Sequence, residues 1–488
     1  GKLARRAEKG DLNAEQRLAA LVDVDSFIET GLLGASAFSD EDAAKTPRDG
    51  KITGFGRIDG RDVGVVVNDF TTKGASTGAT NSKKMGYIRS ACVARGMPFV
   101  HVGESTGVRL PDAMGSKGMG QLLGNDTSQF RRKREVPYVA AALNTSFGSS
   151  AWMCCMADFS VMKKGSIMSV SSPRLVSMAI GEAVDVEALG GWRLHAEQTG
   201  LIDHFVDTDE EAMLAIRAFL SYMPSHNKEL PPEAAVPDGS GDDQERILEI
   251  LPEKRTQVYN MKKIIEVIFD NDSYLEIKPR FGKSLTVGLA RLDGKVVGVI
   301  ANNPNVGGGA LSVEACRKAV DFTVMCDSFN IPIVRSMDTP GFVVGTEAER
   351  RAAPGWIMNF MNTACLTTVP SVTVMCRKAY GRAYVAMGGG AHNDAMIAWP
   401  TAEVSFMDPV FATTIVHNKT PEDEGFEEAL ADIQKDLEVW DMARIATVQD
   451  VVKPQETRER LIRSFEVHRR RLSGGIGDHL MSTWPTSY

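Results

Sequence analysis

Short apolar runs alternate along this chain with stretches in which apolar residues recur at helical spacing. Between residues 302 and 407, "IPIVRSMD" is an apolar run that leads into the turn Pro340-Gly341. A second apolar run, "VPSVTVMC", leads into "RKAYGRAY", where small residues begin a helical pattern. The first N–H groups of a helix have no carbonyl partner, so two such strand ends can aim N–H donors at one point. Donors arranged in this way form an oxyanion hole.

The first half of the chain repeats this pattern. The stretch "GRIDGRDVGVVVND" at 56–69 aligns with "ARLDGKVVGVIANN" at 290–303, at an offset of 234 residues. The stretches "GMPFVHVGESTG" and "NIPIVRSMDTPG" align at the same offset, and Gly148 then aligns with Gly381. Chance similarity would not stay this close to one register over so long a stretch, so we infer an internal duplication.

Two short runs of small residues lie inside the matched stretches. Gly74-Ala75 aligns with Gly309-Ala310 after a shift of one residue in register. Each run follows a predicted strand and precedes a predicted helix, as expected for stacked β-β-α units. The sequence therefore predicts an α/β fold with two related domains in tandem.

The length and composition fit two domains. The chain has 488 residues, of which 43% are hydrophobic and 24% are charged, enough for two full cores. Residues 225–243 are rich in proline, glycine and acidic side chains, which indicates a linker. We predict an N-terminal domain over 1–230, a linker over 231–243 and a C-terminal domain over 244–488.

Several local elements can be predicted from residue patterns. In the first domain we expect a helix over 2–24, a hairpin over 54–67 with Asp59-Gly60 as its turn, a helix over 77–95, and a mobile glycine-rich loop over 103–125 that covers a site. In the second domain we expect an acidic helix over 426–438 and a basic helix over 454–472.

Charge and cysteine content exclude several classes of protein. The formal net charge is −8 without a long basic run, so we expect no nucleic-acid partner. No apolar run reaches the roughly 18 residues that a membrane span needs, and no signal peptide is visible. The seven cysteines lack zinc-type spacing. We expect Cys154, Cys155 and Cys316 to be core residues in a reducing compartment, and we expect no bound metal.

Five motifs together resemble one family. They are "GRIDGR", "LGGWRLHAEQTGLIDHFVD" at 189–207, "CDSFNIPIVRSMDTPGF" at 326–342, "RKAYGRAY" at 377–384 and "AWPTAEVSFM" at 398–407. The chain resembles, over nearly its whole length, the carboxyltransferase (β) subunits of biotin-dependent acyl-CoA carboxylases, of the propionyl-CoA and methylcrotonyl-CoA type. The resemblance implies two tandem crotonase-like (ClpP/crotonase) domains, with acyl-CoA bound by the first and biotin by the second.

The resemblance also implies a reaction. A carboxyl group moves from carboxybiotin to the α-carbon, or the vinylogous γ-carbon, of a short-chain acyl-CoA. Negative charge develops on the thioester oxygen and on the biotin oxygen, and each fixed donor is typically worth about 3–4 kcal/mol of barrier. By resemblance, Gly148-Ser149 holds the thioester oxygen and Arg382-Ala383 holds the biotin oxygen. The freed ureido nitrogen can take the α-proton, so no strong side-chain base is required.

Further site residues follow from the same resemblance. Those expected to bind the acyl-CoA substrate are Ala75, Ser76, Gly107, Tyr384 and Val385, and those expected to bind biotin are Gly309, Ala310, Gly341 and Gly381.

Several of these residues also have a purely structural interpretation. Gly148 and Gly381 could simply permit tight packing of a helix on a strand, but their recurrence in two copies favours function. We expect His195 to be a structural histidine. We expect Glu104 and Asp338, at matched strand ends, to shape loops without acid–base work.

The sequence departs from the family where the acyl group is selected. Propionyl-type enzymes usually have Gly-Gly where this chain has Gly148-Ser149, and Asp where it has Val385. The added hydroxymethyl group and the lost charge predict a pocket of mixed character. We therefore expect a substrate other than plain propionyl-CoA, such as a branched, unsaturated or polar acyl group.

The resemblance implies partners as well. The sequence has neither a Met-Lys-Met biotinylation motif nor an ATP-binding glycine-rich loop of the carboxylase kind. We therefore expect a separate subunit with biotin carboxylase and biotin carrier functions, and a homodimer or homohexamer in the cytoplasm, or in the mitochondrial matrix of a eukaryote. The alternatives are a subunit of a biotin-dependent acyl-CoA decarboxylase and a non-catalytic scaffold paralogue.

Overall fold

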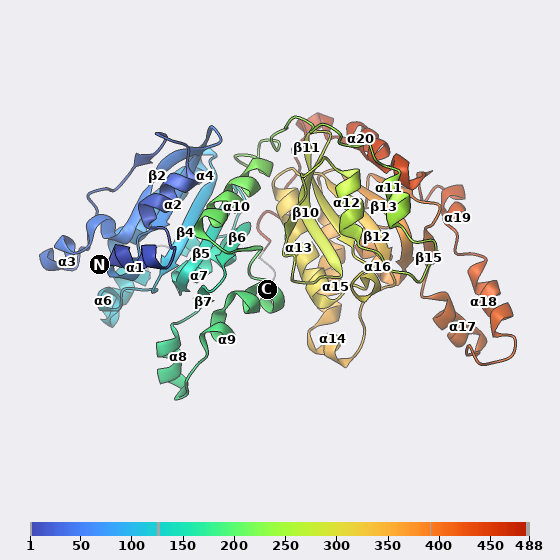
Figure 1. Ribbon diagram of the computed structural model, residues 1–488, viewed down its shortest axis with the longest axis horizontal. Helices are drawn as coiled ribbons and strands as arrows, with labels where there is room; N and C mark the ends of the chain where they lie inside the picture. Colours follow the sequence, from blue (N-terminus) through green and yellow to red (C-terminus); the bar gives the residue numbers. More distant parts are fainter. Residues whose placement is uncertain (1, 124–126, 391, 485–488) are drawn as a thin grey trace. The chain divides into compact units, whose positions relative to one another are not determined.

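The computed structural model describes residues 2–123, 127–390 and 392–484. The chain forms two compact units whose main segments are Gly1–Glu229 and Leu230–Ser482. Each unit contains one sheet covered by helices (Figure 1). The two units are described separately.

The sheet of the first unit has the strand order β1-β2-β3-β4-β5-β6-β8, and β7 pairs with β5 beside this path. The strands β2 and β3 form an antiparallel hairpin, and from β3 onward neighbouring strands are parallel. The strands are β1 (Ile28–Glu29), β2 (Lys51–Ile58), β3 (Arg61–Asn68), β4 (Phe99–Ser105), β5 (Tyr138–Phe147), β6 (Phe159–Lys163), β7 (Ile167–Ser169) and β8 (His204–Val206).

The helices of this unit connect and cover the strands. They are α1 (Lys2–Glu8), α2 (Ala14–Leu21), α3 (Asp40–Ala44), α4 (Ala79–Arg95), α5 (Leu110–Ala113), α6 (Gly115–Gly118), α7 (Ser149–Met156), α8 (Pro173–Ile180), α9 (Val186–Gly190) and α10 (Asp209–Tyr222). Ile88 and Cys92 on α4 are fully buried, and they join a core with Val66, Phe99 and Ala140 of the sheet.

The sheet of the second unit has the order β9-β10-β11-β12-β13-β14-β16, with β15 paired to β13. Its strands are β9 (Leu275–Ile277), β10 (Leu285–Leu292), β11 (Lys295–Asn302), β12 (Ile333–Thr339), β13 (Ser371–Tyr380), β14 (Ala395–Ala398), β15 (Glu403–Ser405) and β16 (Asp450–Val451). Its helices are α11 (Arg246–Ile250), α12 (Met261–Ile268), α13 (Val313–Ser328), α14 (Thr346–Arg350), α15 (Ala353–Leu366), α16 (Gly381–Ala386), α17 (Pro409–His417), α18 (Phe426–Gln434), α19 (Val439–Arg444) and α20 (Thr457–His468).

The two sheets have the same topology, strand for strand, which confirms the predicted duplication. Packing details recur as well. A Cβ on Gly64 of β3 would lie 2.2 Å from the Cys92 sulfur, and a Cβ on Gly298 of β11 would lie 2.6 Å from the Cys326 sulfur. In both units, therefore, a glycine on the hairpin makes room for a buried cysteine on the first long helix.

The backbone corrects one detail of the predicted alignment. The turn Lys73–Ala75 follows β3, and the turn Gly307–Gly309 follows β11. Isolated bridges then join Thr77 to Val108 and Leu311 to Phe342. All these contacts keep the offset of 234 residues, so the one-residue shift inferred at Gly74-Ala75 is wrong.

Two predicted local elements differ from the structure or extend beyond what it describes, and a third is confirmed. The helix expected over 2–24 is divided into α1 and α2, because Asn13 caps α2 with its side chain and Gly10 has a positive φ of 73°. The loop expected over 103–125 begins inside β4 and continues into α5 and α6, and residues 124–126 lie outside the described residues. The hairpin over 54–67 is confirmed, with Asp59 and Gly60 both at positive φ in its turn.

Residues of the predicted linker lie along the second unit. The Ala234 N–H donates to the Gly294 carbonyl at 2.9 Å, and the Asn271 side-chain amide donates to the Asp238 carbonyl at 3.1 Å. Over the described residues, no helix is long and apolar enough to cross a membrane.

Candidate active site

Three segments meet in the first unit at the carboxyl ends of β3, β4 and β5. The Thr77 N–H, after β3, donates to the Gly107 carbonyl at 2.8 Å, and the Arg109 N–H donates back to the Thr77 carbonyl at 2.8 Å. Gly107 also lies against the end of β5, because a Cβ on it would be 3.5 Å from the Phe147 carbonyl oxygen. The carboxyl ends of parallel strands are where α/β sheets bind ligands.

Gly148 turns the chain from β5 into α7. Its φ of 57° and ψ of −119° lie in a region that side chains other than glycine rarely adopt. Its N–H donates to the Ser169 carbonyl at 3.2 Å, and α7 begins at the next residue, Ser149. Helix geometry leaves the N–H groups of the first turn of α7 without an intrahelical carbonyl. The hydroxyls of Thr77 and Ser149 are 2.9 Å apart, which ties the loop after β3 to this helix start.

The second unit repeats this arrangement. The Leu311 N–H donates to the Gly341 carbonyl at 3.0 Å, and the Val343 N–H donates to the Leu311 carbonyl at 2.9 Å. Gly381, with a φ of 60°, begins α16 directly after β13. In the first turn of α16 Arg382 is exposed and Ala383 is buried.

The residues expected from the sequence thus gather at two equivalent places. In the first unit Gly107, Gly148 and Ser149 come together through the contacts above, and Ala75 and Ser76 directly precede Thr77 in the loop after β3. In the second unit, the matching set is Gly309, Ala310, Gly341, Gly381, Arg382 and Ala383.

The loop residues use their own N–H groups within the turns. The donor–acceptor distances are 2.9 Å from Ala75 to Thr72, 3.3 Å from Ser76 to Lys73, 3.0 Å from Gly309 to Val306 and 3.2 Å from Ala310 to Gly307. The loops therefore shape the two candidate sites. The N–H donors without an intrahelical carbonyl partner lie in the first turns of α7 and α16.

Tyr384 and Val385 belong to the second unit. The Tyr384 ring packs on Gly389, where a Cβ would come within 2.4 Å of the ring, and the Tyr384 hydroxyl accepts a hydrogen bond from the Gly390 N–H at 3.1 Å. Val385 is half-buried on α16, next to Tyr384. This packing gives Tyr384 a structural role in the second unit whatever else it contacts.

The carboxylates at the matched strand ends are engaged in ion pairs. Glu104 is buried and binds Arg6 at 2.9 Å and Arg17 at 2.6 Å. Asp338 is buried and binds the Lys378 ammonium at 3.2 Å. Glu104 is therefore tied to helices α1 and α2 and Asp338 to strand β13, and a role of these side chains in shaping the loops stays a prediction.

The histidines near the first site are held by structure. His195 binds the Met168 carbonyl at 2.7 Å and the Thr199 hydroxyl at 3.1 Å through its two ring nitrogens. Burial lowers the pKa of His101, on β4, to about 3, so this side chain is neutral at physiological pH. Neither arrangement leaves a histidine poised as a general base.

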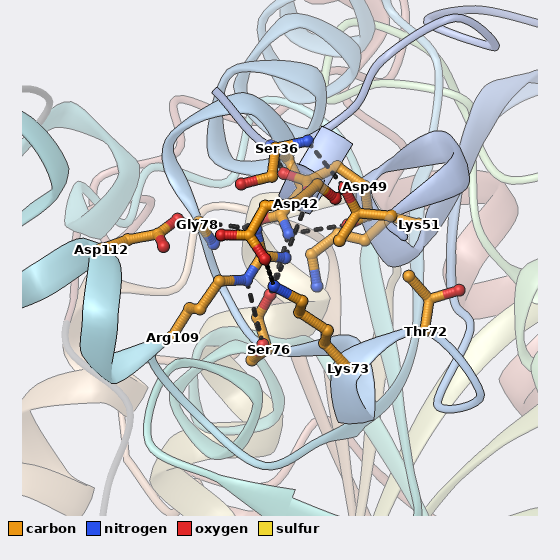
Figure 2. A network of polar contacts seen from close by, with 12 residues as sticks. Ser36, Asp42, Asp49, Lys51, Thr72, Lys73, Ser76, Gly78, Arg109 and Asp112 are labelled. Atoms are coloured by element: carbon orange, nitrogen blue, oxygen red, sulfur yellow. Dashed lines mark hydrogen bonds and ion pairs between the residues drawn. The ribbon is translucent and has the colours of Figure 1, made fainter. Parts of the chain in front are cut away.

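Sequence reasoning missed a buried polar network beneath the loop after β3. It contains Asp49, Lys51 and Arg109, which Figure 2 shows together with Ser76 and Lys73. Arg109 and Asp49 form an ion pair at 2.8 Å with almost no exposed side-chain surface. Lys51 is a charged residue of the hairpin, but Arg57, Arg61 and Asp62 on the same hairpin are exposed or half-buried, so charge alone gave no signal of this network. Among the described residues, no group of three or more His, Cys, Asp or Glu side chains could hold a metal ion.

Comparisons with known proteins agree with this geometry. A family model described as "Carboxyl transferase domain" matches residues 5–473. The propionyl-CoA carboxylase carboxyltransferase subunit of Haloferax mediterranei is 33% identical over 482 residues, covering 94% of this chain and 91% of the relative. The methylmalonyl-CoA decarboxylase subunit alpha of Veillonella parvula is 31% identical over 472 residues, with coverages of 94% and 91%.

Solved structures give the same result. The transcarboxylase 12S structure, described as a hexamer with methylmalonyl-coenzyme A and methylmalonic acid bound, matches with a TM-score of 0.89 at 30% identity. The match covers 96% of this chain and 91% of that one, so both crotonase-like units are included. The chain therefore belongs to the carboxyl transferase family of biotin-dependent acyl-CoA carboxylases, in which it is an acyl-CoA carboxyltransferase subunit.

Proposed function

We propose that this chain moves a carboxyl group from carboxybiotin to the α-carbon, or the vinylogous γ-carbon, of a short-chain acyl-CoA. The observation that carries the proposal is the pair of matched helix starts at Gly148 and Gly381 in a chain of this family. Two oxygens gain negative charge during carboxyl transfer, and each requires fixed donors. The duplication supplies one helix start for each.

The first unit is assigned to acyl-CoA. Gly148 turns the chain so that α7 begins beside Gly107, and the Ser149 N–H donates to the thioester oxygen as the enolate forms. Ala75 and Ser76 line the same place from the loop after β3. The hydroxyl pair of Thr77 and Ser149 adds hydrogen-bonding capacity that a Gly-Gly turn lacks, which favours a polar acyl group.

The second unit is assigned to biotin. Biotin, when bound, supplies the carboxyl group and a ureido nitrogen that takes the α-proton. The N–H groups of Arg382 and Ala383 donate to its ureido oxygen, and Gly309, Ala310 and Gly341 shape the surrounding loops. Backbone N–H donors suit a ureido oxygen, so the residues present fit this group without a metal ligand of this chain.

A separate subunit brings biotin and the ATP-dependent step. The similar proteins include a carboxyltransferase subunit of a propionyl-CoA carboxylase, which supports a multi-subunit enzyme here. None of the seven cysteines forms a disulfide bond, which suits a reducing compartment such as the cytoplasm or the mitochondrial matrix.

Two or more copies of this chain form the working enzyme, as a homodimer or a homohexamer. Each unit extends a helix with an exposed apolar surface beside its site, α8 in the first and α17 in the second (Figure 1). Val170 and Phe406 stand at matched places next to Gly148 and Gly381, and both are more than 70% exposed. Apolar surface of this kind is expected at an interface between subunits, where the acyl-CoA unit of one chain meets the biotin unit of another.

A second candidate is the reverse reaction, decarboxylation of an acyl-CoA. The similarity to the methylmalonyl-CoA decarboxylase subunit, with the same coverage as the carboxylase relative, favours it. The same two sets of donors would serve both directions, because they stabilise the same charges.

Reconstitution tests the proposal. The purified chain is mixed with a biotin carboxylase and biotin carrier subunit, ATP, bicarbonate and a panel of acyl-CoAs. We expect ATP turnover that depends on an acyl-CoA. Turnover in none of these mixtures, with release of CO2 from a carboxylated acyl-CoA instead, would favour the decarboxylase. Inactivity in both directions would leave only the scaffold role.

A further inference from the structure

The loop that follows β3 has an unusual backbone. Lys73, Gly74 and Ala75 have φ values of 45°, 62° and 48°, so three successive residues lie in the left-handed region. Residues other than glycine rarely adopt it, because their Cβ approaches the following carbonyl oxygen. Ala75 is fully buried. The loop is therefore strained at two of its three residues.

The matched loop of the second unit has the same backbone and different residues. Gly307, Gly308 and Gly309 have φ values of 57°, 65° and 82°. Glycine adopts this region without a Cβ clash. A Cβ on Gly309 would lie 2.4 Å from the Asp338 carbonyl oxygen, so the second loop depends on glycine. The first unit must hold the same turn by other means, since strained backbone persists only where its surroundings fix it.

Side chains beneath the first loop bind its carbonyl oxygens. The Ser76 carbonyl accepts hydrogen bonds from the Asn81 side-chain amide at 2.9 Å and from Arg109 Nη2 at 3.2 Å. The Ala75 carbonyl accepts one from the Ser105 hydroxyl at 3.0 Å. Both peptide groups that leave the strained turn are therefore held from below.

Asp49 fixes Arg109 in this position (Figure 2). Arg109 Nη2 lies 2.8 Å from Asp49 Oδ1, and the two side chains are 4% and 0% exposed. Asp49 is tied in turn to Asn81, whose N–H donates to Asp49 Oδ2 at 3.0 Å and whose side chain donates to the Asp49 carbonyl at 2.9 Å. A buried ion pair is tolerated only when both charges keep their partners, so the geometry of this pair is narrowly defined.

Lys51 completes the network from the neighbouring strand. Its ammonium group donates to the Asn68 side chain at 3.0 Å and to the Ala75 carbonyl at 3.4 Å. Lys51 is 1% exposed, and burial lowers its pKa to about 7.

In the second unit, the positions that match three donors of this network carry apolar side chains. At the matched positions stand Val343 for Arg109, Ala315 for Asn81 and Leu285 for Lys51. None of these side chains can donate a hydrogen bond. The second loop keeps one such contact, because the Asn302 side-chain amide donates to the Gly309 carbonyl at 3.4 Å. The donors of Arg109, Asn81 and Lys51 beneath the strained loop have no equivalent at the matched positions of the second unit.

We propose that Arg109, held by Asp49, is a positioning residue for the acyl-CoA half of the reaction. By holding the Ser76 carbonyl it keeps the strained loop in place, and the next residue, Thr77, contacts Ser149 through its hydroxyl. The network therefore fixes the start of α7, to which the proposed function assigns the thioester oxygen. This inference rests on that proposed function.

Three variants test the inference in the reconstituted enzyme. Arg109→Met keeps most of the side-chain length and removes every donor, Ala75→Gly gives the first loop the residue of the second, and the third variant combines the two. Arg57→Met is the matched control, because Arg57 pairs with Asp62 on the exposed hairpin of the same unit.

We expect Arg109→Met to lower kcat about 10- to 100-fold, since small displacements of catalytic groups cost this much. The KM for the biotin carrier should stay unchanged, because that substrate binds the other unit. In the double variant, glycine at position 75 should restore kcat at least about fivefold, because the turn no longer needs to be held. Arg57→Met should behave as wild type.

Two outcomes would overturn the inference. One is an Arg109→Met enzyme with wild-type kcat, and the other is a double variant whose loss equals the product of the single losses. If Arg109→Met does not fold, Asp49→Asn and Arg109→Lys, each with and without Ala75→Gly, give the same comparison. A wild-type enzyme inactive in both directions would overturn the proposed function, whereas active wild type with an equally active Arg109 variant overturns only this inference.

Discussion

The two units have one topology and reach the same loop backbone through different chemistry. Three glycines form the turn after β11, while Lys73, Gly74 and Ala75 form the turn after β3. Glycine forms such a turn without a steric clash, but it loses more conformational entropy on folding than other residues do. A buried charged network fixes the turn but requires desolvation of its charges. The comparison shows that a backbone can be retained while the residues that stabilise it are exchanged.

The two loops also differ in the side chains that they can accommodate. The second loop cannot accept a side chain at Gly309, because the Asp338 carbonyl lies too close. The first loop carries Ala75 at the same place, with the Ser76 hydroxyl next to it. The first loop therefore accommodates a Cβ at a place where the second loop excludes one.

The largest expected effect comes from the glycines that the two units share. Gly148→Ala forces a side chain into a φ of 57° and a ψ of −119°, and it displaces the first donors of α7. We expect kcat to fall about 100- to 1,000-fold, the usual cost of losing one oxyanion donor. Steady-state turnover with saturating acyl-CoA measures it.

Two further variants complete this test. Gly381→Ala should cause a similar loss, because its Cβ would lie 3.0 Å from the Phe406 carbonyl oxygen. Gly165→Ala is the control, since Gly165 also has a positive φ, of 79°, but nothing lies within 4 Å of its Cβ. Equal losses in all three variants would mean that backbone strain alone, without donor placement, explains the effect.

The next effect concerns the exposed helices of the two units. Met178→Asp on α8 or Phe411→Asp on α17 places a charge on apolar surface that the assembly is proposed to bury. We expect the particle mass from light scattering to fall by about twofold or more, with loss of turnover. Leu214→Asp, on the exposed side of α10, should leave mass and turnover unchanged. An unchanged particle mass in both Met178→Asp and Phe411→Asp would show that α8 and α17 are not part of the interface.

A smaller effect is expected at Val385, which lies on α16 of the second unit and is proposed to contact the acyl group. Val385→Asp restores the charged residue of propionyl-type enzymes, and it should shift the ratio of kcat/KM values among short acyl-CoAs by at least about tenfold. Val385→Ile, which keeps the apolar character, is the matched control. Competition assays with pairs of acyl-CoAs measure the ratio. A ratio that stays at the wild-type value would show that Val385 does not read the substrate.

The smallest effect compares Lys51 with Leu285. Burial lowers the pKa of Lys51 from 10.5 to about 7, so above about pH 7 the unfolded state binds more protons than the folded state. The wild type should therefore gain stability as pH rises, whereas Lys51→Leu lacks this gain. Between about pH 7 and pH 9 the free energy of unfolding of the wild type should rise by about 1–2 kcal/mol relative to the variant.

Urea denaturation at several pH values measures this difference. Lys164→Leu is a control, because Lys164 is partly exposed and pairs with the exposed Asp207. A difference between wild type and Lys51→Leu that stays constant with pH would show that Lys51 keeps its proton in the folded state.

Much of the fold could be predicted from the sequence because the duplication repeats local patterns. Alternating apolar residues on both sides of an Asp-Gly turn predict the hairpin at 54–67. Gly148 and Gly381 could be predicted because each ends an apolar run and begins a helix. The break between α1 and α2 could have been found from the Asn13 to Gln16 capping box.

The support beneath the first loop could not be predicted in this way. Arg109 contacts Asp49 and Ser76, which lie in two other segments of the chain, far from it in the sequence. Only the fold brings the three residues together. The strain at Lys73 and Ala75 was hidden as well, because a one-residue shift in the alignment placed Ala75 opposite Ala310. Amino-acid composition does not reveal a shift of one residue between two aligned loops. The backbone angles of the two turns were needed to correct the alignment.

Cys92, which packs against Gly64, and Cys326, which packs against Gly298, can each report local unfolding of their own unit. Burial raises the pKa of the Cys92 thiol to about 12 and raises that of Cys326 well above its ordinary value. Only the thiolate reacts with disulfide reagents, so each sulfur is inert until the helix above its glycine lifts away. The labelling rate of Cys92 therefore follows local unfolding of the first unit, that of Cys326 follows local unfolding of the second unit, and exposed Cys365 sets the reference rate.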